Sequence, residues 1–286
     1  MAPPTRAASP SLRISVVTYS PDAEVLGRTL ASAAAAVLRA QAEGALDSAD
    51  MVLIDNGPDD RARAVVEAAA QSLRDATPGV AATVLSGHGN VGYGAGHNLA
   101  IRDAATDYHL VLNPDVVMAP EALAEAVQFM TRHPDVALLS PRVADEAGRL
   151  QYLCKRHPSP LVLALRGFAP ASVRTLFRAT LERYEMRDLI GERDVVPEVP
   201  IASGAFMFCR TDALRSAGGF DPAFFLYFED FDLSLRIARA GRLSYVPAVR
   251  IVHYGGHTAR KGLAHIRMFA ASAWRFFRKH GWRPAP

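Results

Sequence analysis

Cysteine and long apolar runs are scarce in this chain of 286 residues. Its two cysteines, Cys154 and Cys209, lie far apart and lack the spacing of metal ligands, which argues against a disulfide framework or a zinc site and fits a reducing cytoplasm. No stretch approaches the ~20 consecutive apolar residues that a membrane-spanning helix needs. Residues 1–11 are polar and rich in proline, so we expect a disordered leader rather than a secretory signal.

A large excess of charge of either sign is also absent, and the chain is only mildly basic. Lys and Arg number 32 against 29 Asp and Glu, and the pI is near 9.0, which suits phosphate or an anionic membrane surface without demonstrating either. We expect no nucleic-acid partner. Half of the residues are hydrophobic, enough for a sizeable core. Because no repeat or low-complexity linker interrupts the chain, we expect one domain over residues 12–258 and a helical extension over 259–286.

Short apolar strands alternate with alanine-rich helices along the first half of the chain. We expect strands over residues 13–19, 51–57, 81–85 and 109–112, and helices over 25–43, 61–75 and 98–105. This alternation predicts an α/β fold with a doubly wound, mostly parallel sheet. Further on we expect helices over 120–133, 174–187, 212–217, 229–240 and 262–282, and strands over 136–140, 200–210 and 242–252.

Polar residues follow three of the expected strands. They are Thr18 and Tyr19, Asp55 and Asn56, and Asn113, Pro114 and Asp115. The carboxyl ends of parallel strands share one edge of the sheet, and open α/β sheets bind ligands there. A carboxylate at that edge suits Mg²⁺ or Mn²⁺, which usually accompanies phosphate. An ordinary Asn-Pro-Asp turn is the alternative.

Asp55 has two interpretations of equal weight. Its carboxylate can accept an N–H group of a pyrimidine base, with Asn56 beside it. It can also form an Asx turn that caps the next helix.

Three glycines, Gly92, Gly94 and Gly96, lie between Asn90 and Asn98. A dinucleotide-binding fingerprint does not fit, because the loop follows the third strand and the position of the third glycine holds His97. Glycines still allow the backbone to approach a ligand closely. We therefore expect a ligand loop, with a flexible surface loop as the alternative.

Three carboxylates, Glu229, Asp230 and Asp232, stand within four residues among aromatic side chains. Like charges raise one another's pKa, which can yield a base poised near neutrality. Asp232 is placed to cap a helix and to pair with Arg236, which leaves Asp230 to face a cleft. An acidic first turn that serves the helix dipole is the commoner use of such a cluster.

A histidine, His253, follows the last expected strand. A lone histidine is more often structural than a ligand. Near Asp115, a neutral imidazole would complete a mixed oxygen and nitrogen site for Mn²⁺ or Mg²⁺.

Taken in order, these motifs resemble those of the family 2 glycosyltransferases, most closely the bacterial rhamnosyltransferase-like branch. The resemblance covers residues 14–257 and implies a GT-A fold with inverting transfer of a sugar from a nucleotide-diphosphate donor. It implies Asp230 as the base, with Glu229 as the other member of its acidic pair, and Asp115 with His253 as metal ligands. The family's Asp-x-Asp motif has Asn113 in place of its first acid. The implied donor-binding residues are Thr18, Tyr19, Asp55, Asn56, Gly92, Gly96, Asn98, Asn113 and Asp115.

The resemblance also suggests the substrates. It favours dTDP-rhamnose as donor and a glycan or polyprenyl-diphosphate-linked sugar as acceptor, although no local motif identifies a 6-deoxy sugar. The acceptor would lie against Ser203, Gly204 and Tyr227. Two other functions are a nucleotidyltransferase, which the residues after the first strand do not favour, and an inactive nucleotide-sugar-binding protein, which only Asn113 favours.

The expected C-terminal helix carries an apolar stripe next to basic residues. The stripe is Ile266, Phe269, Ala270, Ala273, Phe276 and Phe277, and the basic residues are Arg267, Arg275, Arg278 and Lys279. This pattern suits a helix on an anionic bilayer, and so a cytoplasmic protein at the inner face of the plasma membrane. A helix packed on the core or in a homodimer interface fits equally well.

Overall fold

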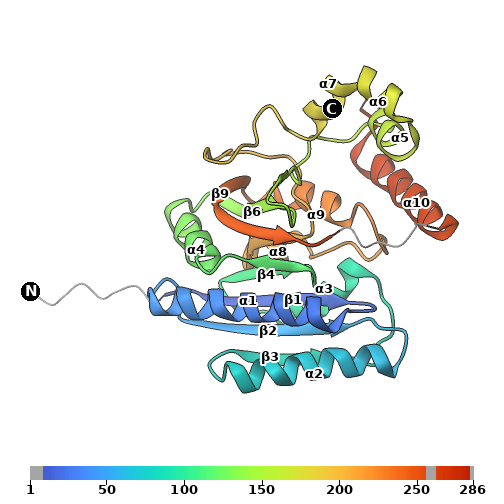
Figure 1. Ribbon diagram of the computed structural model, residues 1–286. Coiled ribbons are helices and arrows are strands. Elements are labelled where there is room, and N and C mark those ends of the chain that lie inside the picture. The colour runs from blue at the N-terminus through green and yellow to red at the C-terminus, as the bar shows by residue number, and fades with distance from the viewer. Residues whose placement is uncertain (1–8, 256–261, 284–286) are drawn as a thin grey trace, which may run out of the picture.

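The computed structural model describes residues 9–255 and 262–283 (Figure 1). Its centre is a nine-stranded sheet in the order β3-β2-β1-β4-β8-β6-β9-β5, with β7 paired to β6. One half consists of parallel strands: β1 (Ser11–Thr18), β2 (Ser48–Asp55), β3 (Ala81–Leu85) and β4 (Tyr108–Leu112). The expected α/β fold with a mostly parallel central sheet flanked by helices is confirmed.

The other half of the sheet contains antiparallel strands. It holds β5 (Val116–Met118), β6 (Val136–Ala144), β7 (Leu150–Gln151), β8 (Phe206–Arg210) and β9 (Arg242–His253). Strand β8 runs antiparallel to both β4 and β6, whereas β6 and β9 are parallel. The short β5, which we did not predict, pairs antiparallel with β9 and places Val116 opposite His253. This pairing brings the residue before β5, Asp115, to the end of β9.

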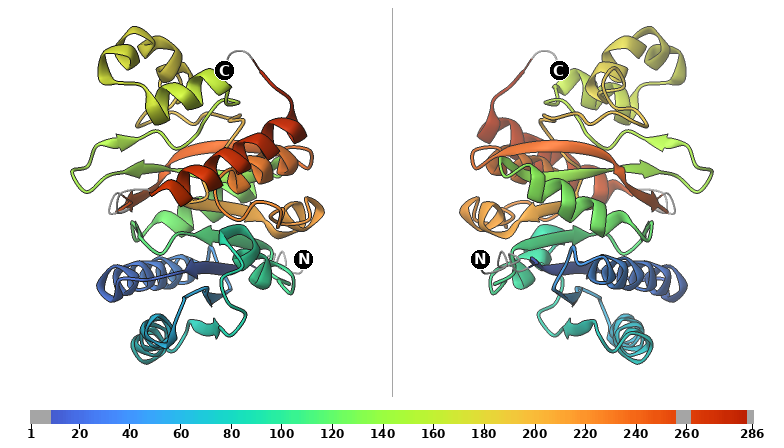
Figure 2. Two further views of the ribbon diagram at one scale, coloured as in Figure 1. Left: turned by 90° about the vertical axis from the view of Figure 1, so that its right-hand side faces the viewer. Right: turned by 90° about the vertical axis from the view of Figure 1, so that its left-hand side faces the viewer.

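Helices cover both faces of the sheet (Figure 2). One face carries α1 (Ala23–Ala42), α2 (Asp60–Ala76) and α4 (Ala122–Arg132), and the other carries α3 (Tyr93–Ile101), α8 (Thr211–Ser216) and α9 (Glu229–Ile237). The carboxylate of Asp22 caps α1 by accepting hydrogen bonds from two backbone N–H groups. The carboxylate of Asp59 caps α2 by accepting a hydrogen bond from one backbone N–H group. The alanine-rich inner faces of α1 and α2 bury against β1 and β2 in the main core.

Four more helices gather at one end of the molecule, at the upper right of Figure 1: α5 (Pro160–Phe168), α6 (Ala171–Leu176), α7 (Arg178–Tyr184) and α10 (Leu263–His280). We did not predict α5, which Ser159 caps and Pro160 begins. The expected helix over residues 174–187 is wrong in its bounds, because the backbone leaves helical geometry at Phe177 and two short helices result.

The C-terminal helix α10 packs on the rest of the chain. Phe276 and Phe277 of the apolar stripe are buried in an aromatic cluster with Phe224 and Phe228. Phe269 and Ala273 pack against this cluster, whereas Ile266 and Ala270 are exposed. Arg275 donates to the carbonyl of Ala223. No helix of the described residues has both the length and the apolar character that crossing a bilayer requires.

Lys279 also faces the protein, since its Nζ lies 2.6 Å from a carboxylate oxygen of Asp221 and 2.7 Å from one of Asp232. Arg275 and Lys279, which one of the two interpretations placed beside a membrane, thus make contacts within the protein.

Candidate active site

Two of the predicted polar strand ends lie side by side at one edge of the parallel half of the sheet, because Thr18 on β1 is in register with Asp55 on β2. Thr18 and Asp55 are buried, whereas Tyr19 is 53% exposed. The third strand end follows β4, the other neighbour of β1, and there the backbone N–H of Asn113 donates to Ala205. The sheet therefore gathers the three motifs at one edge.

The carboxylate of Asp55 forms a tight turn. Its Oδ1 accepts a 2.8 Å hydrogen bond from the N–H of Gly57, and its Oδ2 lies 3.9 Å from the guanidinium of Arg63. The Asx-turn alternative thus describes the local structure, although Asp59, not Asp55, caps the next helix. Oδ2 has no closer partner among the described residues, so it remains the oxygen able to meet a ligand.

The side chain of Asn56 connects the strand end to the glycine loop. Its Nδ2 donates to the carbonyl of Gly92 at 2.9 Å, and its Oδ1 accepts from His88 at 2.9 Å. Gly92 has φ +88°, and a Cβ there would lie 2.4 Å from the carbonyl oxygen of Phe225. Only glycine meets both demands.

Helix α3 begins at Tyr93 rather than Asn98, so Gly94 and Gly96 are helical and not part of a loop. A Cβ on Gly96 would lie 2.9 Å from Val17, which shows that this glycine lets α3 pack closely on β1. The side-chain amide of Asn98 makes two hydrogen bonds to the backbone of Phe220. Its Oδ1 accepts from the N–H at 2.8 Å, and its Nδ2 donates to the carbonyl oxygen at 2.7 Å. Gly96 and Asn98 thus position the backbone around the site.

The acidic pair stands at the start of α9, after two residues in the left-handed region. Tyr227 and Phe228 have φ of +69° and +66°, which is uncommon for bulky residues and typical of functional sites. Asp230 accepts from the N–H of Gly204 at 2.8 Å and from that of Phe231 at 2.9 Å. Glu229 is buried, and its Oε2 has no hydrogen-bond partner among the described residues.

Burial raises the pKa of both Glu229 and Asp230, and the neighbouring charge of Asp230 raises that of Glu229 further. The pair therefore retains protons at a higher pH than ordinary carboxyl groups do. A raised carboxyl pKa of this kind is expected of a general base that works near neutral pH.

Asp232 does not cap α9, since the helix has no side-chain cap. It is fully buried and pairs with Arg236, as expected, at 2.7 Å. Burial alone would raise its pKa, but hydrogen bonds from His280, Lys279 and Arg236 lower the pKa to about 2. Asp232 is thus a permanent anion that joins α9 to α10.

Tyr93 connects the acidic pair to the strand ends. Its hydroxyl donates to the carbonyl of Gly204 at 2.7 Å, while the N–H of Gly204 holds Asp230. Burial raises the pKa of Tyr93, and the charges of Glu229, Asp230 and Asp115 raise it further. The phenol therefore lies within electrostatic reach of both ends of the site.

A cavity of about 380 Å³ opens beside the acidic pair. Its walls come from α5, α7, α9, α10 and the segment before α9, and include Arg166, Tyr184, Tyr227, Glu229, Asp230 and Phe269. The hydroxyl of Tyr227 lies 3.0 Å from Nδ1 of His265. Ser203 is half-buried beside Gly204. The two carboxyl groups thus face a space large enough for a sugar ring.

Asp115 and His253 meet at the ends of β5 and β9. Nε2 of His253 lies 3.3 Å from Oδ1 of Asp115, and that buried oxygen has no hydrogen-bond partner among the described residues. When the imidazole is neutral with its proton on Nδ1, two lone pairs face each other, and a divalent cation bound there would satisfy both. The described part of the chain holds no group of three or more His, Cys, Asp or Glu placed to bind a metal.

Comparison with known proteins identifies the family. The sequence profile described as "Glycosyltransferase like family 2" matches residues 10–281. The chain is 30% identical to N-acetylglucosaminyl-diphospho-decaprenol L-rhamnosyltransferase of Mycobacterium tuberculosis, over 96% of this chain and 87% of that protein. It is also 30% identical to the rhamnosyltransferase WbbL of Escherichia coli, over 60% and 64% of the two chains. The chain belongs to glycosyltransferase family 2.

Solved GT-A glycosyltransferases share the fold of this family 2 member. The mannosyltransferase PcManGT of Pyrobaculum calidifontis, in complex with GDP-mannose and Mn²⁺, aligns with a TM-score of 0.61 at 18% identity over 98% of this chain and 67% of its own. GalNAc-T7 with UDP, GalNAc and Mn²⁺ aligns with a TM-score of 0.58 at 15% identity over 92% and 48%. The resemblance stated from the sequence is confirmed at the level of family and fold.

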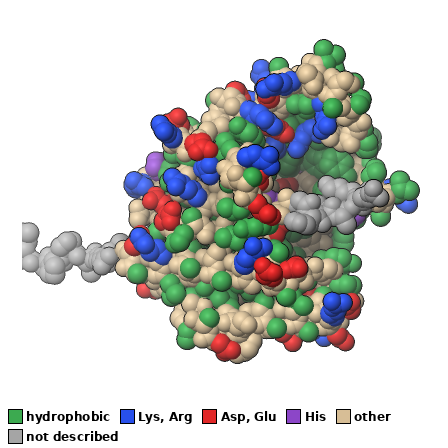
Figure 3. Space-filling view, viewed as in Figure 1, with side chains coloured by type: hydrophobic (Ala, Val, Ile, Leu, Met, Phe, Trp, Pro, Cys, Tyr) green, Lys and Arg blue, Asp and Glu red, His purple; other side chains and the backbone are tan. Residues whose placement is uncertain are grey.

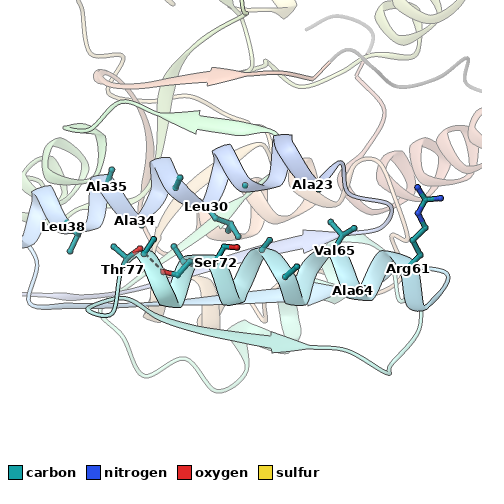
Figure 4. A pocket seen from close by; sticks show the side chains of 16 residues that line it. Ala23, Leu30, Ala34, Ala35, Leu38, Arg61, Ala64, Val65, Ser72 and Thr77 are labelled. Carbon is teal, nitrogen blue, oxygen red and sulfur yellow. Dashed lines mark hydrogen bonds between the residues drawn. The ribbon is translucent and has the colours of Figure 1, made fainter.

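A second hollow of this glycosyltransferase lies away from the acidic pair. A groove of about 740 Å³ lies between α1 and α2. Half of its lining residues are alanine, and Leu30, Leu38 and Val65 also line it (Figure 4). Its polar side chains, among them Arg61, Ser72 and Thr77, do not converge on one point in that view. We therefore assign it no chemistry.

Sequence reasoning missed several residues that line the site. Tyr93 was within the expected loop but received no role, Arg166 and Tyr184 were not considered, and Phe269 was assigned only to the apolar stripe of the C-terminal helix. The last three lie on helices of the end cluster, far in sequence from Asp230. No local pattern signals such convergence, although Tyr93 could have been noted as the only aromatic residue within the glycine loop.

Proposed function

We propose that this glycosyltransferase moves rhamnose, with inversion, from a nucleotide-diphosphate donor to a hydroxyl of a lipid-linked acceptor in cell-surface polysaccharide synthesis. dTDP-rhamnose is the favoured donor, and N-acetylglucosaminyl-diphospho-polyprenol is the favoured acceptor, as the name of the mycobacterial relative suggests. The observation that carries the proposal is Asp230, held by the N–H of Gly204 at the wall of the 380 Å³ cavity.

The reaction needs one proton transfer and one displacement. A carboxylate oxygen of Asp230 accepts the proton of the acceptor hydroxyl as its oxygen forms a bond to the anomeric carbon. The bond from that carbon to the donor diphosphate breaks, and its electron pair leaves with the nucleotide. The raised pKa of Asp230 favours this base role. Glu229 is buried beside it, and the charge of Asp230 raises the pKa of Glu229.

The unpaired oxygen of Asp115 and the facing Nε2 of His253 fit a divalent ion, Mg²⁺ or Mn²⁺. When bound, such an ion would offset the negative charge that develops on the departing diphosphate. With Asn113 in place of an acid, the site has less negative charge than two carboxylates would give it.

The donor would lie along the strand ends. We propose that Thr18, Tyr19 and Oδ2 of Asp55 contact the nucleotide. Asn56, Gly92, Gly96 and Asn98 would hold the surrounding backbone in place, since their polar groups or close contacts are already used within the protein. Ser203, Gly204 and Tyr227 would contact the acceptor.

Location and assembly belong to the proposal as well. We propose a cytoplasmic enzyme at the inner face of the plasma membrane, where a lipid-linked acceptor would be met. Arg267 and Arg278 on α10 remain exposed for an anionic surface. A homodimer stays a second option for the exposed part of that helix.

The test is the variant Asp230→Asn. Its amide oxygen keeps the hydrogen bond from Gly204, but the side chain cannot take a proton. We expect transfer to fall by about 100- to 10,000-fold, the usual contribution of a general base. Binding of dTDP, followed by thermal shift, should be unchanged, and Glu24→Gln on the exposed start of α1 serves as the control. Normal transfer by Asp230→Asn would refute the assignment.

A further inference from the structure

An arginine-rich hollow lies next to the catalytic cavity. It measures about 570 Å³ and is lined by Arg166 of α5, Arg174 of α6, Arg178 of α7 and Arg187, together with Glu182 and Glu185. In Figure 3, Lys and Arg side chains lie across the upper part of the molecule, where Figure 1 places α5, α6 and α7. We call these residues the arginine hollow.

Positive charge in the arginine hollow exceeds its negative charge. Glu185 is close to three cations at once: Arg187 at 2.6 Å, Arg166 at 3.5 Å and Lys155 at 3.8 Å. Lys155 is itself buried. A single carboxylate cannot neutralise three cations that are partly removed from water, so the hollow is suited to an added anion.

Two arginines at the outer side of the hollow differ in their partners. Arg178 pairs with Glu182 at 2.7 Å. The guanidinium of Arg174 makes no hydrogen bond or ion pair to any residue in the described ranges 9–255 and 262–283. Its planar fork is therefore available to a phosphate group, whose oxygens it can contact in pairs.

The hollow and the catalytic cavity are continuous through Arg166, which lines both. The guanidinium of Arg166 lies 5.5 Å from the ring centre of Tyr184, another residue of the cavity wall. An anion held here would lie on the Asp230 side of the site. It would be apart from the ends of β1, β2 and β4, where the donor nucleotide is proposed to bind.

The same helices expose apolar side chains. Phe168 at the end of α5 is 69% exposed, and Leu176 at the end of α6 is 80% exposed, with Val173 between them. Exposed apolar residues beside arginines match a ligand that carries both phosphate and hydrocarbon.

We propose that the arginine hollow binds the diphosphate of the acceptor, while the acceptor sugar occupies the cavity at Asp230 and the lipid leaves along α5 and α6. This inference rests on the proposed function and makes it more specific. The enzyme would recognise its acceptor by the phosphate and not by the sugar alone.

Steady-state kinetics with two acceptors test the proposal. One is an N-acetylglucosaminyl diphosphate lipid, and the other is a neutral alkyl glycoside of N-acetylglucosamine. We expect Arg174→Gln combined with Arg178→Gln to raise KM for the diphosphate lipid by about tenfold or more and to leave its kcat unchanged. For the neutral glycoside we expect both KM and kcat to be unchanged. Arg132→Gln on α4 is the matched control. Equal KM values for wild type and double variant with the diphosphate acceptor would overturn the proposal.

A binding measurement separates this site from the proposed function. Calorimetry with farnesyl diphosphate, with the donor site filled by dTDP and Mn²⁺, should show binding to the wild type and at least about tenfold weaker binding to the double variant. That result supports the site even if no rhamnose is transferred. Unchanged binding by the double variant, or pyrophosphate binding as tightly as farnesyl diphosphate, would overturn a site for a lipid-linked diphosphate.

Discussion

At the scale of single residues, the site depends on groups whose polar atoms are held by the backbone. Asp230 is fixed by two N–H groups, and Gly204 contacts both Asp230 and Tyr93. A change in the backbone of Gly204 would therefore move the carboxyl group of Asp230 and the phenol of Tyr93 together. The precision of the acidic pair therefore comes from the segment before β8 as much as from α9 itself.

Two buried histidines of the core predict how the stability of the protein depends on pH. Ser15 lies 2.8 Å from both Nδ1 of His97 and Nε2 of His109, and all three side chains are fully buried. Burial, with a smaller effect of Arg13, lowers the pKa of His109 to about 3. Burial also lowers that of His97.

Below a pH of about 6.5 the unfolded chain binds protons at these histidines that the folded chain does not, so stability falls as the pH drops from about 6.5 toward 3. For His109 the loss between pH 7 and pH 5 is about 2 kcal/mol. We expect His109→Gln to remove that part of the loss in urea unfolding, with His133→Gln as the control. The same pH dependence in wild type and His109→Gln would contradict it.

At the scale of elements, ion pairs join α10 to α9, the helix that begins with the acidic pair. Lys279 contacts Asp221 and Asp232, and Nε2 of His280 lies 2.7 Å from Asp232. The aromatic cluster around Phe276 lies next to these ion pairs. We therefore infer that α10 stabilises α9 and the acidic pair at its start.

This role predicts the effect of Lys279→Met, which keeps the apolar stem and removes the charge. The buried Asp232 would lose one of its cations, and we expect the free energy of unfolding to fall by about 1 kcal/mol, since Lys279 is partly exposed. Urea denaturation measures this change. Arg278→Met, on the exposed side of α10, should have almost no effect. If both variants are equally stable, the ion pairs do not hold the helix.

The elements also show what a sequence can predict. The strands β1, β2, β3 and β4 followed from apolar runs, because their pattern is local. The short β5 did not, since three residues form a strand only through pairing with β9. Its pairing is what places His253 beside Asp115. His253 and Asp115 lie close together, as expected, but the strand pairing that brings them together was not predicted.

At the scale of the whole molecule, the site is assembled from segments that are distant in sequence. Sequence patterns predicted the family, the fold and the carboxylates at strand ends. They could not predict the cavity wall, because Arg166, Tyr184 and Phe269 converge only after α5, α7 and α10 pack together. The proposed division of the chain after residue 258 stays a prediction, and the family profile extends beyond it to residue 281.

The measurement that tests the central claim most directly is the structure of the product. The purified enzyme would be supplied with dTDP-rhamnose, Mn²⁺ and an N-acetylglucosaminyl diphosphate lipid, and the new glycosidic bond would be characterised by NMR. We predict a rhamnosyl product whose anomeric configuration is opposite to that of the donor, formed by the wild type and not by Asp230→Asn. A product with retained configuration, or no transfer to this acceptor, would contradict the account.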